Sequence, residues 1–143
     1  MATINPYLNF NLNSEAAFNF YKRIFGGEFT TFQRFGDVPG MGDNLSDAEK
    51  QALMHVALPI GKGSVLMGSD VLPSRGHPKA EGNNFYISLQ ADSKEEADKL
   101  FDGLSAGGNI EMPLQDTFWN AYFGMLQDKF GTRWMINHDY PQS

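Results

Sequence analysis

Histidine is the side chain best suited to acid–base chemistry near neutral pH, and this chain has 3 of them. His55 lies in an alternating run of apolar and polar residues, whereas His77 lies among prolines and glycines and His138 follows the last predicted strand. We expect His77 and His138 to be solvated surface residues. His55 is the candidate catalytic residue, as a general base or as a hydrogen-bond donor to a ligand. Alternatively, it is a half-buried structural residue bonded to a neighbour such as Asp70.

Other catalytic chemistries are excluded by what the sequence lacks. There is no cysteine, so disulfides, thiolate zinc sites and a cysteine nucleophile are impossible. There is also no Gly-x-Ser-x-Gly elbow, and the glycine-rich segment 36–42 lacks the Lys-Ser/Thr ending of a phosphate loop. We interpret that segment as a mobile loop with at most a gating role.

Length and composition narrow the class of protein further. The chain has 143 residues and a formal net charge of −6, and its length predicts one domain with a substantial core. Its 13% of aromatic residues is a generous share, which favours a wide apolar interior or an apolar pocket. The acidic balance and the lack of any lysine/arginine cluster argue against nucleic-acid binding. No apolar run is as long as a membrane span, and the first residues show no secretory signal. We therefore expect a cytoplasmic protein that binds neither nucleic acid nor a membrane.

Apolar periodicity predicts two blocks of elements, separated by a polar stretch rich in Pro and Gly at 71–83. In each block a strand is followed by a helix, a Gly-Gly pair and three more strands. The predicted strands are 4–10, 28–35, 53–60, 64–69, 84–89, 109–112, 122–127 and 132–137. The first predicted helix is 14–25, capped by Asn13 or Ser14. The second begins with a capping box of Ser93 and Glu96 and ends before Gly107.

The two blocks are repeats of each other. Residues 5–10 align with residues 84–89, Ser14 aligns with Ser93, and the apolar stripes of the two helices align as well. We therefore predict a single domain, 1–143, made of two βαβββ modules at about 3–70 and 84–138, in the α+β class. A single ferredoxin-like domain is the alternative, but it lacks the extra hairpin that follows each crossover here.

Alternation along the first strand of each module assigns its side chains to two faces. The apolar set should pack beneath the helices and consists of Leu8, Phe10, Phe85, Ile87 and Leu89. The alternate set should face the other way and consists of Asn5, Tyr7, Asn9, Asn84, Tyr86 and Ser88. Because sheets twist and curl, we expect the modules to enclose a cup lined by this neutral set. Such a lining suits a small organic ligand.

Several short motifs occur in order along nearly the whole chain. They are Pro6-Tyr7-Leu8, Glu15-Ala16-Ala17, Phe20-Tyr21, Met54-His55-Val56, Leu66-Met67-Gly68-Ser69-Asp70, Thr117-Phe118-Trp119, Phe123-Gly124 and the block from Asp128 to Asn137. The last block, Asp-x-Phe-Gly-x-x-Trp-Met-Ile-Asn, is the most specific. Together these motifs resemble the PhnB-like branch of the glyoxalase/bleomycin resistance/dioxygenase (vicinal oxygen chelate) superfamily. The resemblance implies tandem βαβββ modules with mixed, curved sheets that enclose a cup.

Enzymes of this superfamily hold a divalent metal on His or Glu side chains from the first and last strands of each module. The corresponding positions in this chain are Asn5, Asn84 and residues within 65–67 and 133–135, and none is His, Asp or Glu. A neutral amide is a poor ligand for zinc, manganese or iron. The resemblance therefore implies the fold, while the residues predict no metal site. The glycine-rich turn of an S-adenosylmethionine site is also absent, so we predict no cofactor.

These observations favour a metal-free protein that binds a small organic molecule, as the bleomycin resistance proteins of the superfamily do. The candidate ligand-binding residues are Tyr7, Asn9, His55, Tyr86, Trp119, Tyr122 and Trp134. The alternative is a lyase, isomerase or dioxygenase acting on a small oxygenated substrate, with His55 as its base or as a shifted metal ligand. A third hypothesis is a structural dimer whose cup is filled by its own side chains. The resemblance also implies a homodimer.

Overall fold

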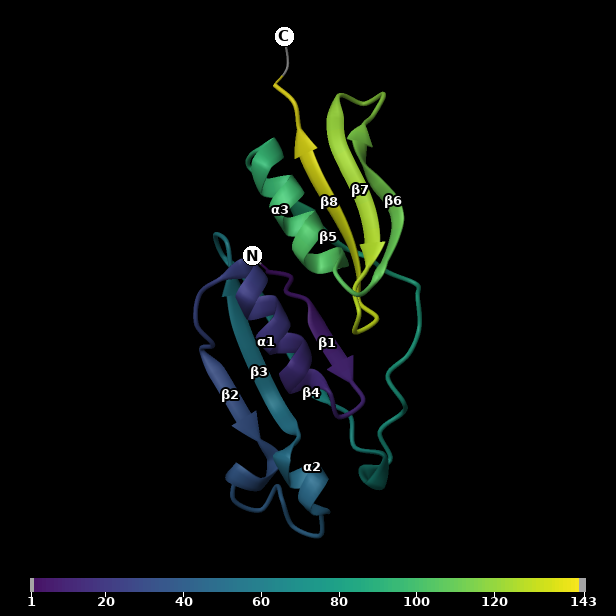
Figure 1. Ribbon diagram of the computed structural model, residues 1–143. Coiled ribbons are helices and arrows are strands. Elements are labelled where there is room, and N and C mark those ends of the chain that lie inside the picture. Colours follow the sequence, from purple (N-terminus) through teal and green to yellow (C-terminus); the bar gives the residue numbers. More distant parts are fainter. Residues whose placement is uncertain (1, 142–143) are drawn as a thin grey trace. The chain divides into compact units, whose positions relative to one another are not determined.

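The computed structural model describes residues 2–141 and divides into two compact units, the first ending at Glu81 and the second beginning at Gly82. Each unit contains one four-stranded sheet and one long helix that covers a single face of that sheet (Figure 1). The α+β class and the βαβββ order of each unit are those predicted from the sequence. Within residues 2–141, no helix has both the length and the apolar composition needed to cross a membrane.

The first unit contains a mixed sheet with the strand order β1-β4-β3-β2. Its elements are β1 (Tyr7–Phe10), α1 (Ser14–Phe25), β2 (Thr31–Arg34), α2 (Asp47–Gln51), β3 (Leu53–Ile60) and β4 (Ser64–Asp70), with 3-10 turns at Phe35–Asp37 and Pro73–Arg75. Strands β1 and β4 are parallel, and the other pairs are antiparallel. The first strand begins at Tyr7, later than the predicted residue 4.

The second unit repeats this topology with the strand order β5-β8-β7-β6. Its elements are β5 (Ile87–Gln90), α3 (Lys94–Ser105), β6 (Asn109–Asp116), β7 (Ala121–Gln127) and β8 (Arg133–Asp139). Strand β6 is longer than the predicted 109–112 and pairs with β7 through two register shifts. At the start of α3 the Ser93 hydroxyl accepts a bond from the Glu96 N–H, as predicted, while the Glu96 carboxylate accepts one from the Asp92 N–H.

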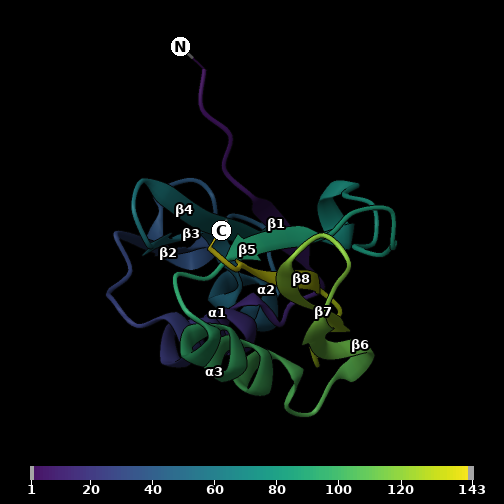
Figure 2. The same ribbon diagram turned by 90° about the horizontal axis from the view of Figure 1, so that it is seen from above.

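Figure 2 shows the helices and sheets from a second direction. The apolar core of each unit lies between its helix and its own sheet. The fully buried side chains of the first unit include Ala17, Phe18, Tyr21, Val56 and Leu58, and those of the second include Ala97, Leu104, Leu126, Trp134 and Ile136. The prediction that Phe85 packs in the core was wrong. Phe85 is 60% exposed, because β5 begins only at Ile87 and Phe85 precedes it.

Two glycines allow the helices to approach their sheets closely. A Cβ atom at Gly68 of β4 would lie 2.7 Å from the Leu8 carbonyl oxygen and 2.7 Å from Cε1 of Phe18. A Cβ atom at Gly124 of β7 would lie 2.7 Å from Cε2 of Phe101. Both distances are shorter than van der Waals contact, so a phenylalanine ring of each helix rests on a glycine of the strand beneath it.

Asp70, at the end of β4, connects three elements through its buried carboxylate, which is 4% exposed. The carboxylate accepts bonds from the Ser14 N–H (2.9 Å), the Ser14 hydroxyl (2.6 Å) and the Leu53 N–H (2.9 Å). The side chain of Asn13 makes no capping bond to α1. The first helix is therefore capped by a strand residue distant in sequence rather than by Asn13.

A small buried cluster lies beside the segment 36–42, which the sequence predicts to be a mobile loop. Phe35, Leu45, Ala52 and Leu72 form a buried cluster, and Met41 and Met54 pack against it. The Arg75 guanidinium lies over the Phe35 ring at 5.8 Å and donates to the carbonyl oxygen of Met41 at 2.5 Å. Met41 of this segment thus packs against the cluster and is bonded to Arg75. The mobility and the gating role of residues 36–42 stay a prediction.

Candidate functional site

Strand pairing in the first unit defines a face that its own helix does not cover, which we call the first open face. Tyr7, Met67 and Ala57 are in register across β1, β4 and β3, and Gln33 is opposite His55. The alternate residues Leu8, Gly68 and Val56 pack toward α1. The side chains of the first open face are therefore Tyr7, Asn9, Thr31, Gln33, His55, Ala57, Met67 and Ser69.

Tyr7 and His55 form a bonded pair on the first open face. The Tyr7 hydroxyl lies 3.1 Å from Nδ1 of His55, and the two rings stack with centroids 5.6 Å apart and planes at 21°. Tyr7 is 43% exposed, so this pair can be reached from outside the unit. The expected partner of His55, Asp70, is the wrong one, because Asp70 lies on the opposite face of the sheet. The pair fixes the orientation of the His55 ring, which is what either a ligand donor or a general base requires.

The other two histidines bond to the backbone and lie off the first open face. Nδ1 of His77 accepts a bond from the Leu72 N–H at 2.8 Å, and Nδ1 of His138 lies 3.0 Å from the Ala91 carbonyl oxygen. His77 is exposed, as the sequence predicts, whereas His138 is only partly exposed. Each ring is held by its contact with the backbone.

The second unit has an equivalent uncovered surface, the second open face. Its members alternate with Trp134, Ile136, Gly124 and Leu126, which pack toward α3. They are Tyr86, Ser88, Gln90, Glu111, Met112, Phe123, Met125, Gln127, Arg133, Met135 and Asn137. This face carries more charge than the sequence analysis expected, because it includes an arginine and a glutamate.

Glu111 links Tyr86 and Arg133 at one end of the second open face. The Tyr86 hydroxyl donates to Oε1 of Glu111 at 2.6 Å, and Nη1 of Arg133 pairs with Oε2. The hydrogen bond to Glu111 raises the pKa of Tyr86 above its ordinary value. The nearby Tyr86 hydroxyl, followed by the Glu111 charge, raises the pKa of Arg133. The phenol therefore stays neutral, and the arginine charge is balanced within the cluster.

Methionines and amides occupy the rest of the second open face. Met112, Met125 and Met135 are in register across β6, β7 and β8. Asn137 donates from Nδ2 to Gln90 and to Asp139, each at 2.9 Å. Methionine surfaces adapt to varied apolar shapes, so this row suits an apolar or aromatic part of a ligand.

Trp119 lies in the turn between β6 and β7 and belongs to an exposed aromatic group. Its ring centroid is 5.5 Å from that of Phe123 and 5.0 Å from that of Phe118. Trp119 is 47% exposed and Phe118 is 97% exposed. Because Phe123 belongs to the second open face, Trp119 extends that face at one end.

Two of the predicted ligand-binding residues lie on the helix side of the second sheet. The Tyr122 hydroxyl donates to Asp98 of α3 at 2.6 Å. Trp134 is fully buried, and its Nε1–H donates to the Asp128 carboxylate at 2.9 Å. Neither position supports the prediction of ligand contact, since α3 covers this side. The signal that was missed is alternation, because Trp134 and Ile136 mark the apolar positions and place Arg133, Met135 and Asn137 opposite them.

Alkaline titration should report the bond between Tyr122 and Asp98. That hydrogen bond raises the pKa of Tyr122 to about 12, and a bond to Asp116 raises the pKa of Tyr140 to about 12. An unfolded tyrosine titrates near 10, so the native state holds these protons more tightly. The stabilisation is complete below about pH 10 and is lost as the pH rises toward 12.

We therefore expect the free energy of unfolding, measured in urea, to fall across this interval, and we expect Tyr122→Phe to remove part of the fall. Tyrosinate absorbance of the folded protein checks the titration directly. An unchanged profile in Tyr122→Phe would contradict the assignment.

The donor set of the two open faces does not fit a divalent metal. Asn5 uses its amide oxygen to accept a bond from the Val65 N–H at 3.1 Å. His55 is the single imidazole of the first open face, and Glu111 on the second is already paired with Arg133. Within residues 2–141, no group of three or more His, Cys, Asp or Glu side chains is arranged to hold a metal ion. The residues present suit hydrogen bonding to an organic molecule better than coordination.

Comparison with known proteins agrees with this geometry. The family model described as Glyoxalase/Bleomycin resistance protein/Dioxygenase superfamily matches residues 3–136, and the chain belongs to this superfamily. Among curated proteins, it is 35% identical over 137 residues to Protein YjdN of Escherichia coli K12, covering 94% of this chain and 93% of that one.

Two solved structures extend the comparison. Protein PA1353 from Pseudomonas aeruginosa is 41% identical, with a TM-score of 0.85 and coverage of 97% of this chain and 98% of that one. The PhnB protein from Bacillus cereus is 25% identical, with a TM-score of 0.75 and coverage of 96% and 99%. The superfamily and the PhnB-like resemblance predicted from the motifs are thus confirmed.

Proposed function

We propose that this protein binds a small organic molecule on its open sheet faces without using a metal. The observation that carries the proposal is the bonded and stacked pair of Tyr7 and His55, which is accessible and lies on a face that lacks a set of metal ligands. Pockets for organic ligands combine apolar or aromatic walls with a few oriented polar groups. The first open face offers that combination through Tyr7, His55, Met67 and Asn9.

A thermal-shift screen of small aromatic and heterocyclic compounds tests this proposal. A ligand at 100 times its dissociation constant stabilises a protein by about 2.7 kcal/mol, which for a domain of this size raises the melting temperature by about 5–10 °C. For a compound that binds at the pair, we expect His55→Ala to lower the affinity by about tenfold, because the oriented ring is lost. Tyr7→Phe, which keeps the stacking but loses the hydroxyl, should have a smaller effect.

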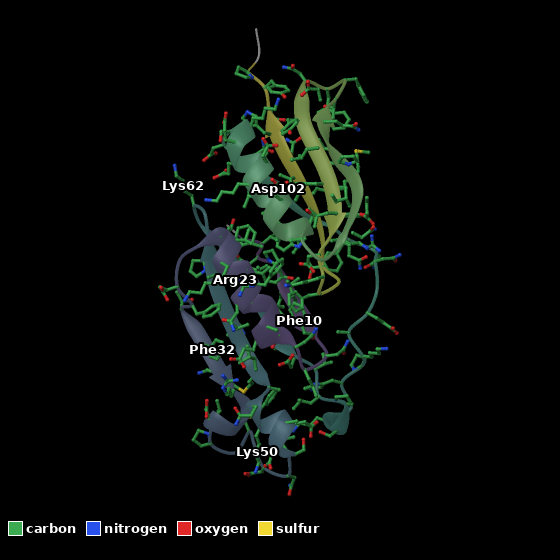
Figure 3. The ribbon with its side chains drawn as sticks, in the orientation of Figure 1. Phe10, Arg23, Phe32, Lys50, Lys62 and Asp102 are labelled. Carbon is green, nitrogen blue, oxygen red and sulfur yellow. The ribbon has the colours of Figure 1, made fainter. Side chains whose placement is uncertain are left out.

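Lys62→Ala, in the turn between β3 and β4 (Figure 3), is the control and should bind as the unmodified chain does. A broad screen without any stabilising compound would contradict the proposal. Equal affinity in His55→Ala for every compound that binds would remove this pair from the site.

A lyase or isomerase activity is the second candidate, and the fixed orientation of His55 favours it. In the tautomer whose Nδ1–H donates to the Tyr7 oxygen, Nε2 is the basic nitrogen and can take a proton from a carbon beside a carbonyl group. Proton NMR of hydroxyacetone in heavy water tests this step. An enzyme would exchange that carbon-bound proton for deuterium faster than buffer does, and His55→Gln would abolish the excess. We expect no excess, because metal-free binding is the function we propose.

We also propose a homodimer located in the cytoplasm. The first part is supported by large apolar side chains that stay uncovered within the units, such as Phe85 and Ile110, which are 60% and 50% exposed. Light scattering coupled to size-exclusion chromatography tests it. A monomer at micromolar concentrations would contradict it.

A further inference from the structure

Two buried polar atoms of β8 lack a hydrogen-bond partner. Within the part of the chain that the structure describes, Nε of Arg133 and Oδ1 of Asn137 are the buried side-chain nitrogen and oxygen atoms with this property. They come from residues four apart on one strand, so both belong to the second open face, with Met135 between them. Buried polar groups are almost always bonded, so an unpaired donor and an unpaired acceptor on one face need an explanation.

The contacts of Arg133 and Asn137 with their neighbours determine which atom of each side chain lacks a hydrogen-bond partner. Nη1 of Arg133 is engaged by Glu111, and the Tyr86 ring lies 5.9 Å from the guanidinium carbon. The amide nitrogen of Asn137 donates to both Gln90 and Asp139. Because a carboxylate can only accept, the bond to Asp139 fixes the amide orientation and leaves Oδ1 as the unused acceptor.

The charges around these two atoms do not favour an anion. The Arg133 charge is balanced by Glu111, and Asp139 adds a negative charge beside Asn137. Between the two ends lie Met135 and Met125, whose side chains accept apolar and aromatic shapes. The second open face thus presents a hydrogen-bond donor at Arg133, an apolar centre at the methionines and an acceptor at Asn137, all in one line. It carries no net positive charge.

We infer that the second open face recognises an uncharged, elongated molecule about the size of two fused rings. A carbonyl oxygen at one end accepts from Nε of Arg133, and a hydroxyl or N–H at the other end donates to Oδ1 of Asn137. The Cα atoms of these residues are about 13 Å apart along the strand, which leaves room for such a molecule with a hydrogen bond at each end. This inference rests on the proposed function and adds the chemical class of the ligand.

Calorimetric titration of the full chain with 7-hydroxycoumarin, at a pH where its hydroxyl is protonated, tests the inference. This probe is neutral and carries a carbonyl and a hydroxyl at opposite ends of two fused rings. Coumarin lacks only the hydroxyl and should bind about 5–10-fold more weakly. Coumarin-3-carboxylic acid, an anion, should bind at least tenfold more weakly than coumarin.

Variants assign the two ends of the probe. Asn137→Leu should abolish the difference between 7-hydroxycoumarin and coumarin. Arg133→Lys keeps a cation beside Glu111 but loses Nε, so it should lower the affinity for both neutral probes by the same factor of about 5. Lys99→Ala, on the exposed surface of α3, is the matched control and should change neither affinity. The comparison of probes on the unmodified chain stands even where a variant fails to fold.

Three results would overturn the inference: equal affinity for coumarin and 7-hydroxycoumarin, tighter binding of the carboxylate, or no binding of either neutral probe. The thermal-shift screen separates these failures from failure of the proposed function. Stabilisation by other compounds, with no preference for the neutral probes, leaves the proposed function standing and rejects only this ligand class.

Discussion

Replacing Asp70 with alanine is expected to lower the free energy of unfolding by about 3 kcal/mol or more. The substitution leaves the N–H groups of Ser14 and Leu53 and the Ser14 hydroxyl without their acceptor in a buried place. A buried donor that loses its partner costs about 1–3 kcal/mol, and bonds to a charged group lie toward the upper end of that range. Urea unfolding followed by circular dichroism measures the loss.

Two further variants separate this effect from a general effect of charge. Asp70→Asn keeps one carbonyl oxygen but turns an amide donor toward other donors, so we expect a loss of about 2 kcal/mol. Asp102→Asn removes the same charge from an exposed position on α3 (Figure 3) and should change stability by less than about 0.5 kcal/mol. If Asp70→Asn lowers the free energy of unfolding no more than Asp102→Asn does, the bonds of the Asp70 carboxylate to Ser14 and Leu53 do not stabilise the first unit.

Replacing Trp134 with alanine is expected to cost about 3–5 kcal/mol, the range for removing a fully buried aromatic side chain. The indole fills the space between β8 and α3, and its Nε1–H bonds to Asp128, which is 3% exposed. Both the apolar contacts and this bond are lost in the variant. Urea unfolding of the full chain, followed by far-ultraviolet circular dichroism, measures the result.

Trp134→Phe distinguishes a structural role from a ligand-binding one. Phenylalanine keeps most of the packing but loses the bond to Asp128, so we expect a loss of about 1–3 kcal/mol with unchanged affinity for any ligand of the open faces. Trp119→Phe, at an exposed ring, should show the reverse pattern. A drop in ligand affinity in Trp134→Phe without loss of stability would contradict the assignment of Trp134 to the core.

The fold could be predicted because its information is local and repeated. Alternation in the strands, the apolar stripes of α1 and α3 and the spacing of the two blocks each depend on a few neighbouring residues. The errors lie where local rules stop. Phe85 belongs to an alternating pattern that begins before the first residue of β5. The cap of α1 comes from Asp70, which is distant in sequence, so no rule about neighbouring residues predicts it.

The candidate site could be predicted only in part, because it depends on register between strands. Alternation placed Tyr7 and His55 on the same side, but the stacking of their rings follows from how β1, β4 and β3 align. Trp134 and Tyr122 were chosen for their residue type, but side chains alternate between the two faces along β8 and β7, and these two lie on the face that α3 covers. The same alternation puts Arg133 and Asn137 on the second open face, although neither is among the candidate ligand-binding residues of the sequence analysis.

Dependence of ligand binding on metal tests the central claim most directly. The melting temperature of the full chain should be measured with a compound from the screen, in the presence and absence of excess chelator. Because His55 and Glu111 lie on separate sheets and neither has other strong metal ligands beside it, we predict the same stabilisation in both conditions. A stabilisation that disappears with chelator and returns on adding zinc, manganese or iron would contradict the account.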